Sequence, residues 1–231
     1  MKEDRKKEER DFAILYQINQ HNNDLNKDLD GIETLDNFVN ADNIRRAILF
    51  DFFQIGELLS QLSEPFLKEF NNKHASDLIS MRNRIVHGYG SLRDDIIFYT
   101  LKNDFPQFID ELMNFGKTRY KRMVKNLLGK KIKVIIDRPI GFNHEGIIYE
   151  INYGYTKVLT ALDGQFQDAY IIDSNVKEET VEGFVIAVID REDDVEKKLI
   201  VSINNQKYSK TDIEKAVHFQ EQFFKHIIIT N

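Results

Sequence analysis

The sequence predicts an α+β protein with two domains: an all-α bundle of four or five helices over residues 1–128, then a small β-barrel or sandwich with a C-terminal helix over residues 129–231. Two observations predict this. Up to about residue 128, apolar side chains recur every three or four residues, as on one face of a helix. Beyond Gly129, short apolar runs alternate with turns rich in Gly, Asp and Asn, as strands do. A chain of this length has room for one or two hydrophobic cores.

Apolar periodicity and its interruptions define the helices of the first half. Asp30-Gly31 ends the first periodic stretch, and Asn40 can cap the second. Pro65 marks a break followed by a short turn or helix, and Pro106 is expected to kink the last helix. The predicted helices cover residues 12–29, 42–62, 75–87 and 92–128.

Six short apolar runs predict an antiparallel arrangement of strands in the second half. They cover residues 132–136, 146–149, 157–159, 169–172, 183–189 and 198–203. Residues 210–228 return to a helical pattern, with Ser209 or Thr211 as candidate cap and Glu214 placed to complete a capping box.

Composition excludes several classes of protein. No run approaches the ~18 apolar residues of a membrane span. The absence of cysteine excludes disulfides and thiolate sites, and the charged first residues lack the apolar core of a signal peptide, so we expect a cytoplasmic protein. Residues 1–130 hold 20 basic and 21 acidic side chains and residues 131–231 hold 12 and 17, so neither half is a general polyanion binder. Residues 117–133 contain no acid, which fits either phosphate contacts or a solvated helix face that runs into a linker.

Arg82 and His87 form the first candidate site. They are five residues apart at the expected end of a helix, where Gly88 suits the left-handed stop. The negative pole of the helix favours protonated histidine and brings its titration near working pH. Together they could bind a phosphate and move a proton, which suffices to cleave RNA through its own 2′-hydroxyl without a metal. The alternative is structural, because both residue types are common in the last turn of any helix.

The neighbouring motifs resemble a known family. Residues 48–58, residues 81–89 and the Asn-Asp-Phe-Pro of 103–106 are together similar to the HepT family of HEPN-superfamily toxins, whose R-x4-H-x-Y signature is complete here. The resemblance implies a HEPN bundle that forms a homodimer, in which two copies of the signature meet in a cleft and cleave RNA without a metal cofactor. It implies that Arg82 and His87 are catalytic, that Asn83 supports them, and that both lie near the two-fold axis.

The same resemblance assigns three further residues. Tyr89 is the position at which an MNT-type nucleotidyltransferase antitoxin would attach AMP and block the cleft; the alternative is a tyrosine packed under the turn. Glu57 matches the glutamate of the family's Gly-Glu pair and would contact the cleft or an arginine, unless it forms a buried structural ion pair. Arg93 departs from the family, which often has an acid there, so partner contacts or loop geometry are expected to differ.

A second candidate site follows in the strand region. Tyr149-Glu-Ile-Asn-Tyr-Gly-Tyr and Leu162-Asp-Gly-Gln-Phe-Gln-Asp resemble the central motifs of soluble family I inorganic pyrophosphatases, over about residues 129–225. That resemblance implies a five-stranded OB-type barrel in which carboxylates hold Mg²⁺ ions that activate a water against pyrophosphate. The implied metal ligands are Asp163, Asp168 and Glu196, and the implied phosphate-binding residues are Tyr153 and Lys198.

The pyrophosphatase pattern is incomplete. Gln165 stands where the family has its middle acid, and the later acid-and-lysine motif survives only as Asp190, Glu196 and Lys198 with one extra residue. Phe223 and Phe224 replace the family's Tyr-Lys pair that touches phosphate. Asp137, Arg138 and His144 are the candidate stand-ins for the family's early basic and acidic groups. Glu192, Asp193 and Asp194 are either other metal ligands or a solvated hairpin tip. Losing charge-neutralising groups costs such a site most of its catalysis. We therefore expect a binding or regulatory role for this domain, and the alternative is a purely structural one.

Composition, motifs and resemblances together leave three classes of function. The leading hypothesis is a metal-independent endoribonuclease toxin of a toxin–antitoxin system, with RNA and the antitoxin as partners and a pyrophosphatase-like domain fused to it. The alternative is a Mg²⁺-dependent pyrophosphatase or phosphohydrolase that carries a helical dimerisation module. The third is a non-catalytic interaction protein. RNA cleavage in EDTA supports the first class, and phosphate release with magnesium supports the second.

Overall fold

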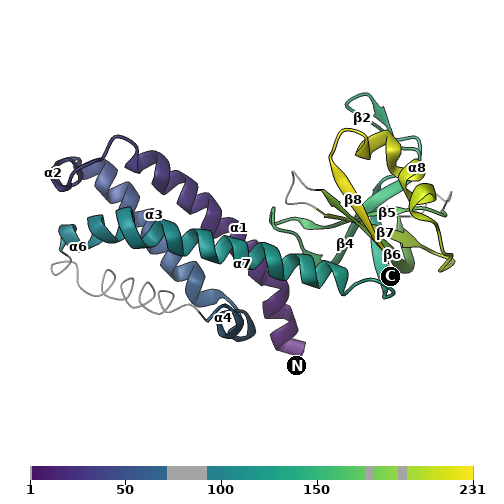
Figure 1. Cartoon of the computed structure of the whole chain (residues 1–231), viewed down its shortest axis with the longest axis horizontal. Coiled ribbons are helices and arrows are strands. Elements are labelled where there is room, and N and C mark those ends of the chain that lie inside the picture. The colour runs from purple at the N-terminus through teal and green to yellow at the C-terminus, as the bar shows by residue number, and fades with distance from the viewer. Residues whose placement is uncertain (1, 72–92, 175–178, 192–196, 231) are drawn as a thin grey trace. The chain divides into compact units, whose positions relative to one another are not determined.

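The structure, a computed structural model, describes residues 2–71, 93–174, 179–191 and 197–230 (Figure 1). The chain divides into two compact units, Met1–Lys117 and Thr118–Asn231. The division falls inside a helix, ahead of the helix end near which the sequence placed its boundary, and the domain limit at residue 128 stays a prediction. None of the helices in the described ranges combines the length and hydropathy that crossing a membrane requires.

The first unit is helical, as predicted. Its elements are α1 (Lys2–Leu29), α2 (Leu35–Asn40), α3 (Asp42–Gln61), α4 (Glu64–Phe70), α6 (Asp94–Tyr99) and the first part of α7 (Phe105–Lys125). The sequence missed α2, whose signal is a single cap: the hydroxyl of Thr34 accepts the backbone N–H of Asn37 at 3.2 Å. The helix predicted at residues 75–87 lies outside the described residues.

Aromatic side chains hold α7 against the other helices. Phe105 meets Phe52 of α3 with ring centroids 5.2 Å apart. Further along α7, Phe108 and Phe115 pack against α4, where Phe66 and Phe115 are 5.1 Å apart edge to face. Such aromatic pairs stabilise by more than their buried area alone. Unit 1 therefore has one core, from which α7 leads onward in the chain.

The helix that precedes α7 is distorted where the sequence predicted a kink. Thr100–Asp104 forms a π-helical turn, in which the backbone N–H of Phe105 donates to the carbonyl of Thr100, five residues earlier. Pro106 explains this, because a proline ring clashes with the carbonyl four residues before it and has no N–H to donate. The distortion is thus a widened turn just ahead of the proline.

The second unit contains a closed five-stranded barrel. Its strands are β1 (Lys131–Arg138), β4 (Asn152–Thr160), β5 (Phe166–Ile171), β6 (Thr180–Arg191) and β7 (Lys197–Ser202), and a short hairpin of β2 (Asn143–His144) and β3 (Ile147–Ile148) interrupts the chain. The ring order is β1-β4-β5-β7-β6 and back to β1. This is the OB-type barrel that the resemblance implied, and closure leaves the ring without a free edge.

The expectation of an entirely antiparallel barrel was wrong, because β5 and β7 pair in parallel. The long strand β6 explains the difference. Its first half pairs with β1 and its second half with β7, both antiparallel. The last strand of the ring, β7, runs antiparallel to β6. In that direction it lies parallel to β5, with which it closes the barrel.

The C-terminal helix is shorter than predicted. The helix α8 (Lys210–Glu221) is followed by the strand β8 (His226–Thr230), which pairs antiparallel with β6. The helical prediction over the last residues was wrong because three consecutive isoleucines favour a strand once a partner is present. Ser209 is the cap, as proposed, but Asp212 completes the capping box in place of Glu214.

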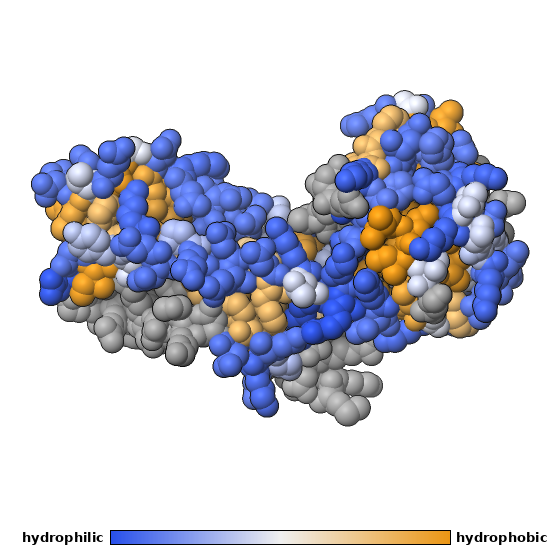
Figure 2. Space-filling model, viewed as in Figure 1, coloured by the Kyte–Doolittle hydropathy of each residue, from blue (hydrophilic) through white to orange (hydrophobic). Residues whose placement is uncertain are grey.

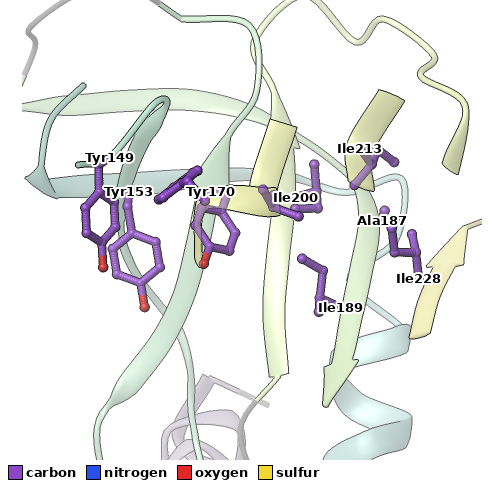
Figure 3. Close-up of a cluster of buried hydrophobic side chains, with 10 residues drawn as sticks. Tyr149, Tyr153, Tyr170, Ala187, Ile189, Ile200, Ile213 and Ile228 are labelled. Atoms are coloured by element: carbon purple, nitrogen blue, oxygen red, sulfur yellow. The ribbon is translucent and has the colours of Figure 1, made fainter. Parts of the chain in front are cut away.

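Three tyrosines lie in a row in the core of the barrel unit (Figure 3). Tyr153 is centred between Tyr149 and Tyr170, with ring centroids 5.4 Å and 4.9 Å away. The same buried cluster takes in side chains of β6, β7, α8 and β8, namely Ala187, Ile189, Ile200, Ile213, Val217, Phe219 and Ile228. Tyr149 and Tyr170 both pack edge to face against Phe219 of α8, and between them they hold the ring of Tyr153, whose hydroxyl contributes to the site described below.

Gly154 is a point where β1 and β4 come too close for a side chain. A Cβ added there would lie 1.9 Å from the backbone oxygen of Ile135. We expect Gly154→Ala to cost about 1–3 kcal/mol or more, because the obstructing group is backbone. Hydrogen exchange followed by peptide mass spectrometry should show lost protection in both strands. Gly116→Ala, whose Cβ would meet only the movable end of Leu15, is the control that should leave exchange unchanged.

His226 makes the stability of the C-terminal strand depend on pH. Burial opposes its protonation, but the carbonyl of Phe224 and the carboxylate of Glu214 outweigh burial and raise the pKa of His226 above 6.5. The folded state therefore binds the proton more tightly, so this stabilisation is complete below pH 6.5 and is lost as pH rises through the raised pKa. In urea unfolding, Glu214→Gln should destabilise the protein more at the acidic end of this window than above it. Equal destabilisation at both ends would contradict this origin.

Candidate functional site

The predicted catalytic signature of the helical unit lies outside the described residues. This applies to Arg82, Asn83, His87 and Tyr89 alike. Of the residues predicted for this site, the structure describes Glu57, which is partly buried on α3 directly after the buried Gly56. The roles of all five residues therefore stay predictions.

The structure does describe what holds both ends of the signature segment. Before it, Ser63 caps α4, and the buried carboxylate of Asp11 accepts both the backbone N–H of Ser63 at 2.8 Å and its hydroxyl at 2.6 Å. After it, Arg45 of α3 donates to Asp94 at 2.7 Å, at the first turn of α6. Arg93, the departure from the family pattern, pairs with Asp95. The helices on either side of residues 72–92 are thus tied to α1 and α3.

In the barrel, the structure brings together three of the predicted residues. Lys198 of β7 donates to the carboxylate of Asp168 on β5 and to the hydroxyl of Tyr153 on β4, the latter at 3.0 Å. The ammonium also lies 5.6 Å from the centre of the Tyr153 ring. Lys198 and Tyr153 are almost fully buried, so their charge and dipole act in a medium of low polarity. The three residues come together because β4, β5 and β7 are consecutive neighbours in the barrel.

Arg138, proposed as a stand-in, belongs to the same cluster. Its guanidinium donates to the hydroxyl of Tyr149 at 2.5 Å and lies over the rings of Tyr149 and Tyr153, 5.5 Å and 5.3 Å from their centres. Burial and the negative charge of Asp168 raise the pKa of the neighbouring Asp137, although Arg138 acts against them. We call Arg138, Tyr149, Tyr153, Asp168 and Lys198 the barrel site. It places two cations over aromatic rings, and one of them, Lys198, is paired with Asp168.

The barrel site does not fit a magnesium centre. Asp168 is already paired with Lys198, and the carboxylate of Asp163 accepts the backbone N–H of Gln165 at 2.9 Å within the β4–β5 turn. Across the described part of the chain, no three acids or histidines lie close enough to hold a metal ion. Glu196 and the acids at 192–194 lie outside the described residues. We therefore derive no step through a metal, and the ligand roles of Asp163, Asp168 and Glu196 stay predictions.

Asp190, the other acid of the incomplete pattern, forms ion pairs with two lysines. Although burial opposes it, hydrogen bonds from Lys121 and Lys197 lower the pKa of Asp190. Lys121 belongs to the acid-free stretch 117–133, and Lys131 of the same stretch pairs with Glu182 at 2.9 Å. Part of the basic stretch thus neutralises acids of the barrel unit.

The remaining stand-ins do not join the barrel site. His144 lies in β2, partly buried. Phe223 is 64% exposed, and the guanidinium of Arg191 lies 3.5 Å from the centre of the Phe224 ring.

Two buried polar contacts escaped sequence reasoning. Arg191 and Glu221 form a doubly hydrogen-bonded ion pair, at 2.9 Å and 2.8 Å, to which Tyr170 donates at 2.6 Å. Tyr120, near the end of α7, donates to Gln167 at 2.6 Å. A buried tyrosine or glutamine carries no local signal of its partner, since the partners are 30 to 51 residues away.

The family model described as "Ribonuclease HepT-like" matches residues 18–115. Residues 18–115 are a HepT-like domain. The HepT-like domain includes the segment with Arg82, His87 and Tyr89, which the sequence singled out.

Curated relatives match over a similar length. The chain is 28% identical over 103 residues to "Putative RNase MJ1380" of Methanocaldococcus jannaschii, which covers 43% of this chain and 91% of the relative. It is 26% identical over 100 residues to "Putative RNase MJ0127" of the same organism, which covers 43% of this chain and 82% of the relative.

Solved structures resemble part of the chain as well. An inorganic pyrophosphatase from Coxiella burnetii matches with 15% identity and a TM-score of 0.36, over 45% of this chain and 86% of the other. The inorganic pyrophosphatase from Ehrlichia chaffeensis matches with 19% identity and a TM-score of 0.35, over 45% of this chain and 87% of the other. The barrel is defined by its strand order, β1-β4-β5-β7-β6 and back to β1.

Proposed function

We propose that the protein is a ribonuclease toxin, in which the HepT-like domain cleaves RNA without a metal ion. The observation that carries the proposal is the complete Arg82-Asn83-x3-His87-x-Tyr89 signature inside the region that matches the ribonuclease family. Two curated relatives whose printed names call them RNases support the substrate class. The toxin role and the two-copy cleft come from the family resemblance.

The chemistry follows from the residue types in the signature. The 2′-oxygen of a ribose attacks the adjacent phosphorus, the bond to the 5′-oxygen breaks, and the products are a 2′,3′-cyclic phosphate and a free 5′-hydroxyl. His87 removes the proton of the attacking hydroxyl or delivers one to the leaving oxygen. Arg82 stabilises the negative charge that develops on the phosphate oxygens. In a homodimer, the second copy supplies the second histidine, so one acts as base and the other as acid.

Exposed apolar residues support self-association. At the end of the helical unit formed by α2 and α6, the surface carries an apolar area (Figure 2). Val39, Ile44, Ile96 and Tyr99 are each more than 40% exposed there. Large apolar side chains gathered on a surface are typical of a contact with another protein.

The experiment that tests the ribonuclease uses the full chain and end-labelled RNA in EDTA. We expect fragments that end in cyclic phosphate, formed at the same rate with and without the chelator. Intact RNA under all conditions would overturn the proposal, and cleavage that requires an added divalent ion would overturn its metal-independent chemistry.

Regulation would act through Tyr89. An MNT-type nucleotidyltransferase antitoxin transfers AMP to the hydroxyl: the phenolic oxygen bonds to the α-phosphorus of ATP, and pyrophosphate leaves. The added phosphate repels RNA from the cleft. Incubation with such an enzyme and ATP should increase the mass by one adenylyl group and abolish cleavage. Tyr89→Phe should remain unmodified, and Tyr16→Phe, which changes an exposed tyrosine of the same unit, is the matched control. Modification of Tyr89→Phe would contradict the assignment.

The barrel would bind the pyrophosphate that this transfer releases. The barrel site supports this by placing the cations of Lys198 and Arg138 around Tyr153. Calorimetry with sodium pyrophosphate in EDTA should detect binding that is lost in Lys198→Met and kept in Lys131→Met, an exposed lysine of the same barrel. Absence of binding to the wild-type protein would overturn this role. Steady phosphate release with magnesium would favour the pyrophosphatase alternative.

A further inference from the structure

One outer face of the barrel continues beyond the barrel site. Alternate residues of a strand lie on one face, and directly opposed residues on neighbouring strands share that face. Tyr155 of β4 is opposite Ile135 of β1 and Asp168 of β5. Lys157 and Lys133 are therefore on the same face as Tyr155, and both are exposed. At the start of β5, this face also carries Phe166.

Tyr155 and Phe166 form a stacked pair on this face. Their ring planes differ by only 11°, with centroids 5.6 Å apart, and the ring of Phe166 is 44% exposed. The ammonium of Lys157 lies 5.4 Å from the centre of the same ring. The other aromatic ring pairs recorded in the described part of the chain are tilted or edge to face, with interplanar angles of 42° or more.

Two parallel rings with an adjacent cation match the chemistry of single-stranded nucleic acid. A base stacks on a flat exposed ring, and its phosphate is attracted by a nearby lysine. The pair lies on β4 and β5, the second and third strands of the ring, which is the face that OB-type barrels use for oligonucleotides. The acid next to the pair, Asp168, is neutralised by Lys198, whereas Asp163 leaves a negative charge at the β4–β5 turn. Phosphates are therefore favoured on the side of Lys157, whereas Lys133 is directly opposite Glu182 of β6, which offsets its charge.

We propose that Tyr155, Phe166 and Lys157 form a stacking platform for an unpaired stretch of RNA. The choice of RNA rests on the proposed ribonuclease function; the platform itself rests on the ring geometry. It is separate from the barrel site, whose groups are Arg138, Tyr149, Tyr153, Asp168 and Lys198. One or two bases stack on the exposed ring, and the ammonium of Lys157 moves from the ring to a phosphate.

The platform is tested by fluorescence anisotropy with a labelled oligouridine and the full chain in EDTA. Phe166→Ala should weaken binding by roughly 5- to 150-fold, the loss of one base stack, and Phe166→Tyr should restore it. Lys157→Gln should reduce the slope of log K against log salt by about 0.7, the release of one counterion from a single strand. Phe223→Ala removes another exposed phenylalanine of the same unit, 64% exposed, and should bind as the wild type.

These outcomes distinguish failure of the proposed platform from failure of the proposed ribonuclease function. Wild-type affinity in Phe166→Ala, an equal loss in Phe223→Ala, or no RNA binding by the wild-type protein would overturn the platform, even if the chain cleaves RNA. Binding that depends on Phe166 in a protein that never cleaves RNA would support the platform and overturn the ribonuclease. Circular dichroism of each variant shows that the compared proteins are folded.

Discussion

Replacing His87 by alanine is expected to lower the rate of RNA cleavage by about 10²–10⁴-fold, the contribution of one general acid or base. The proposed role gives the residue a proton at the moment of bond cleavage, so the loss should appear in the rate and leave RNA affinity unchanged. Single-turnover cleavage in EDTA measures the rate, and anisotropy with the same RNA measures the affinity. Arg82→Ala should also slow the reaction because it removes stabilisation of developing charge.

The matched controls for this prediction come from the same stretch of sequence. His74→Ala removes a histidine before the signature, and Arg84→Gln removes an arginine at a position that the signature leaves open. They should cleave at the wild-type rate. If all of these variants slow cleavage equally, the effect is structural, and if His87→Ala cleaves normally, the histidine has no part in the chemistry.

Arg191→Ala should produce the largest loss of stability in the barrel unit. Glu221 is fully buried and Arg191 is 5% exposed, so removing the guanidinium leaves a carboxylate without its charge partner. Breaking such a pair costs about 3–5 kcal/mol, most of it the uncompensated charge. The neighbouring Tyr170 is also shielded from solvent: burial and the charge of Glu221 raise the pKa of its hydroxyl. Urea unfolding followed by tyrosine fluorescence measures the loss.

Two comparisons distinguish buried charge from lost packing. The double variant Arg191→Met with Glu221→Gln removes both charges, and we expect it to recover much of the stability that Arg191→Ala loses. Lys131→Ala breaks an exposed pair in the same barrel and should cost no more than about 1 kcal/mol. If the double variant is as unstable as Arg191→Ala, packing of the arginine rather than its charge is what the barrel needs.

The prediction of the helices succeeded where the signal is local. Ser209 was found as a helix cap because the cap and the N–H groups it binds are within three residues of each other. Glu214 lies three residues after Thr211, the other candidate cap, whereas Asp212 lies three residues after Ser209 and completes its capping box; Glu214 is bound by His226 from a later strand. Local pattern thus located the helix start to within two residues and could not choose between two candidate caps, each followed by an acid three residues later.

Local sequence signals likewise revealed some contacts of the candidate sites and not others. Asp168, Tyr153 and Lys198 could be assigned together because a family motif already links them, and the structure brings them into contact. The same two motifs contain Tyr155 and Phe166 but give no sign that their rings stack, since the rings meet only after β4 and β5 pair across an irregular register. The sequence therefore pointed to three residues that the structure brings into contact, whose functional roles stay predictions, and it gave no sign of the stacked pair Tyr155 and Phe166.

The sequence by itself determined where helix gives way to strand, and it supplied the signature that marks the HepT-like domain. Those features depend on the identity and spacing of neighbouring residues, which the chain carries into any environment. Only the tertiary structure decided that Ile227–Ile229 form a strand, that β7 closes the barrel in parallel with β5, and that Glu221 accepts Arg191. Each of these is a contact between distant segments, whose free energy depends on which partner strand or charge the folded chain places within reach.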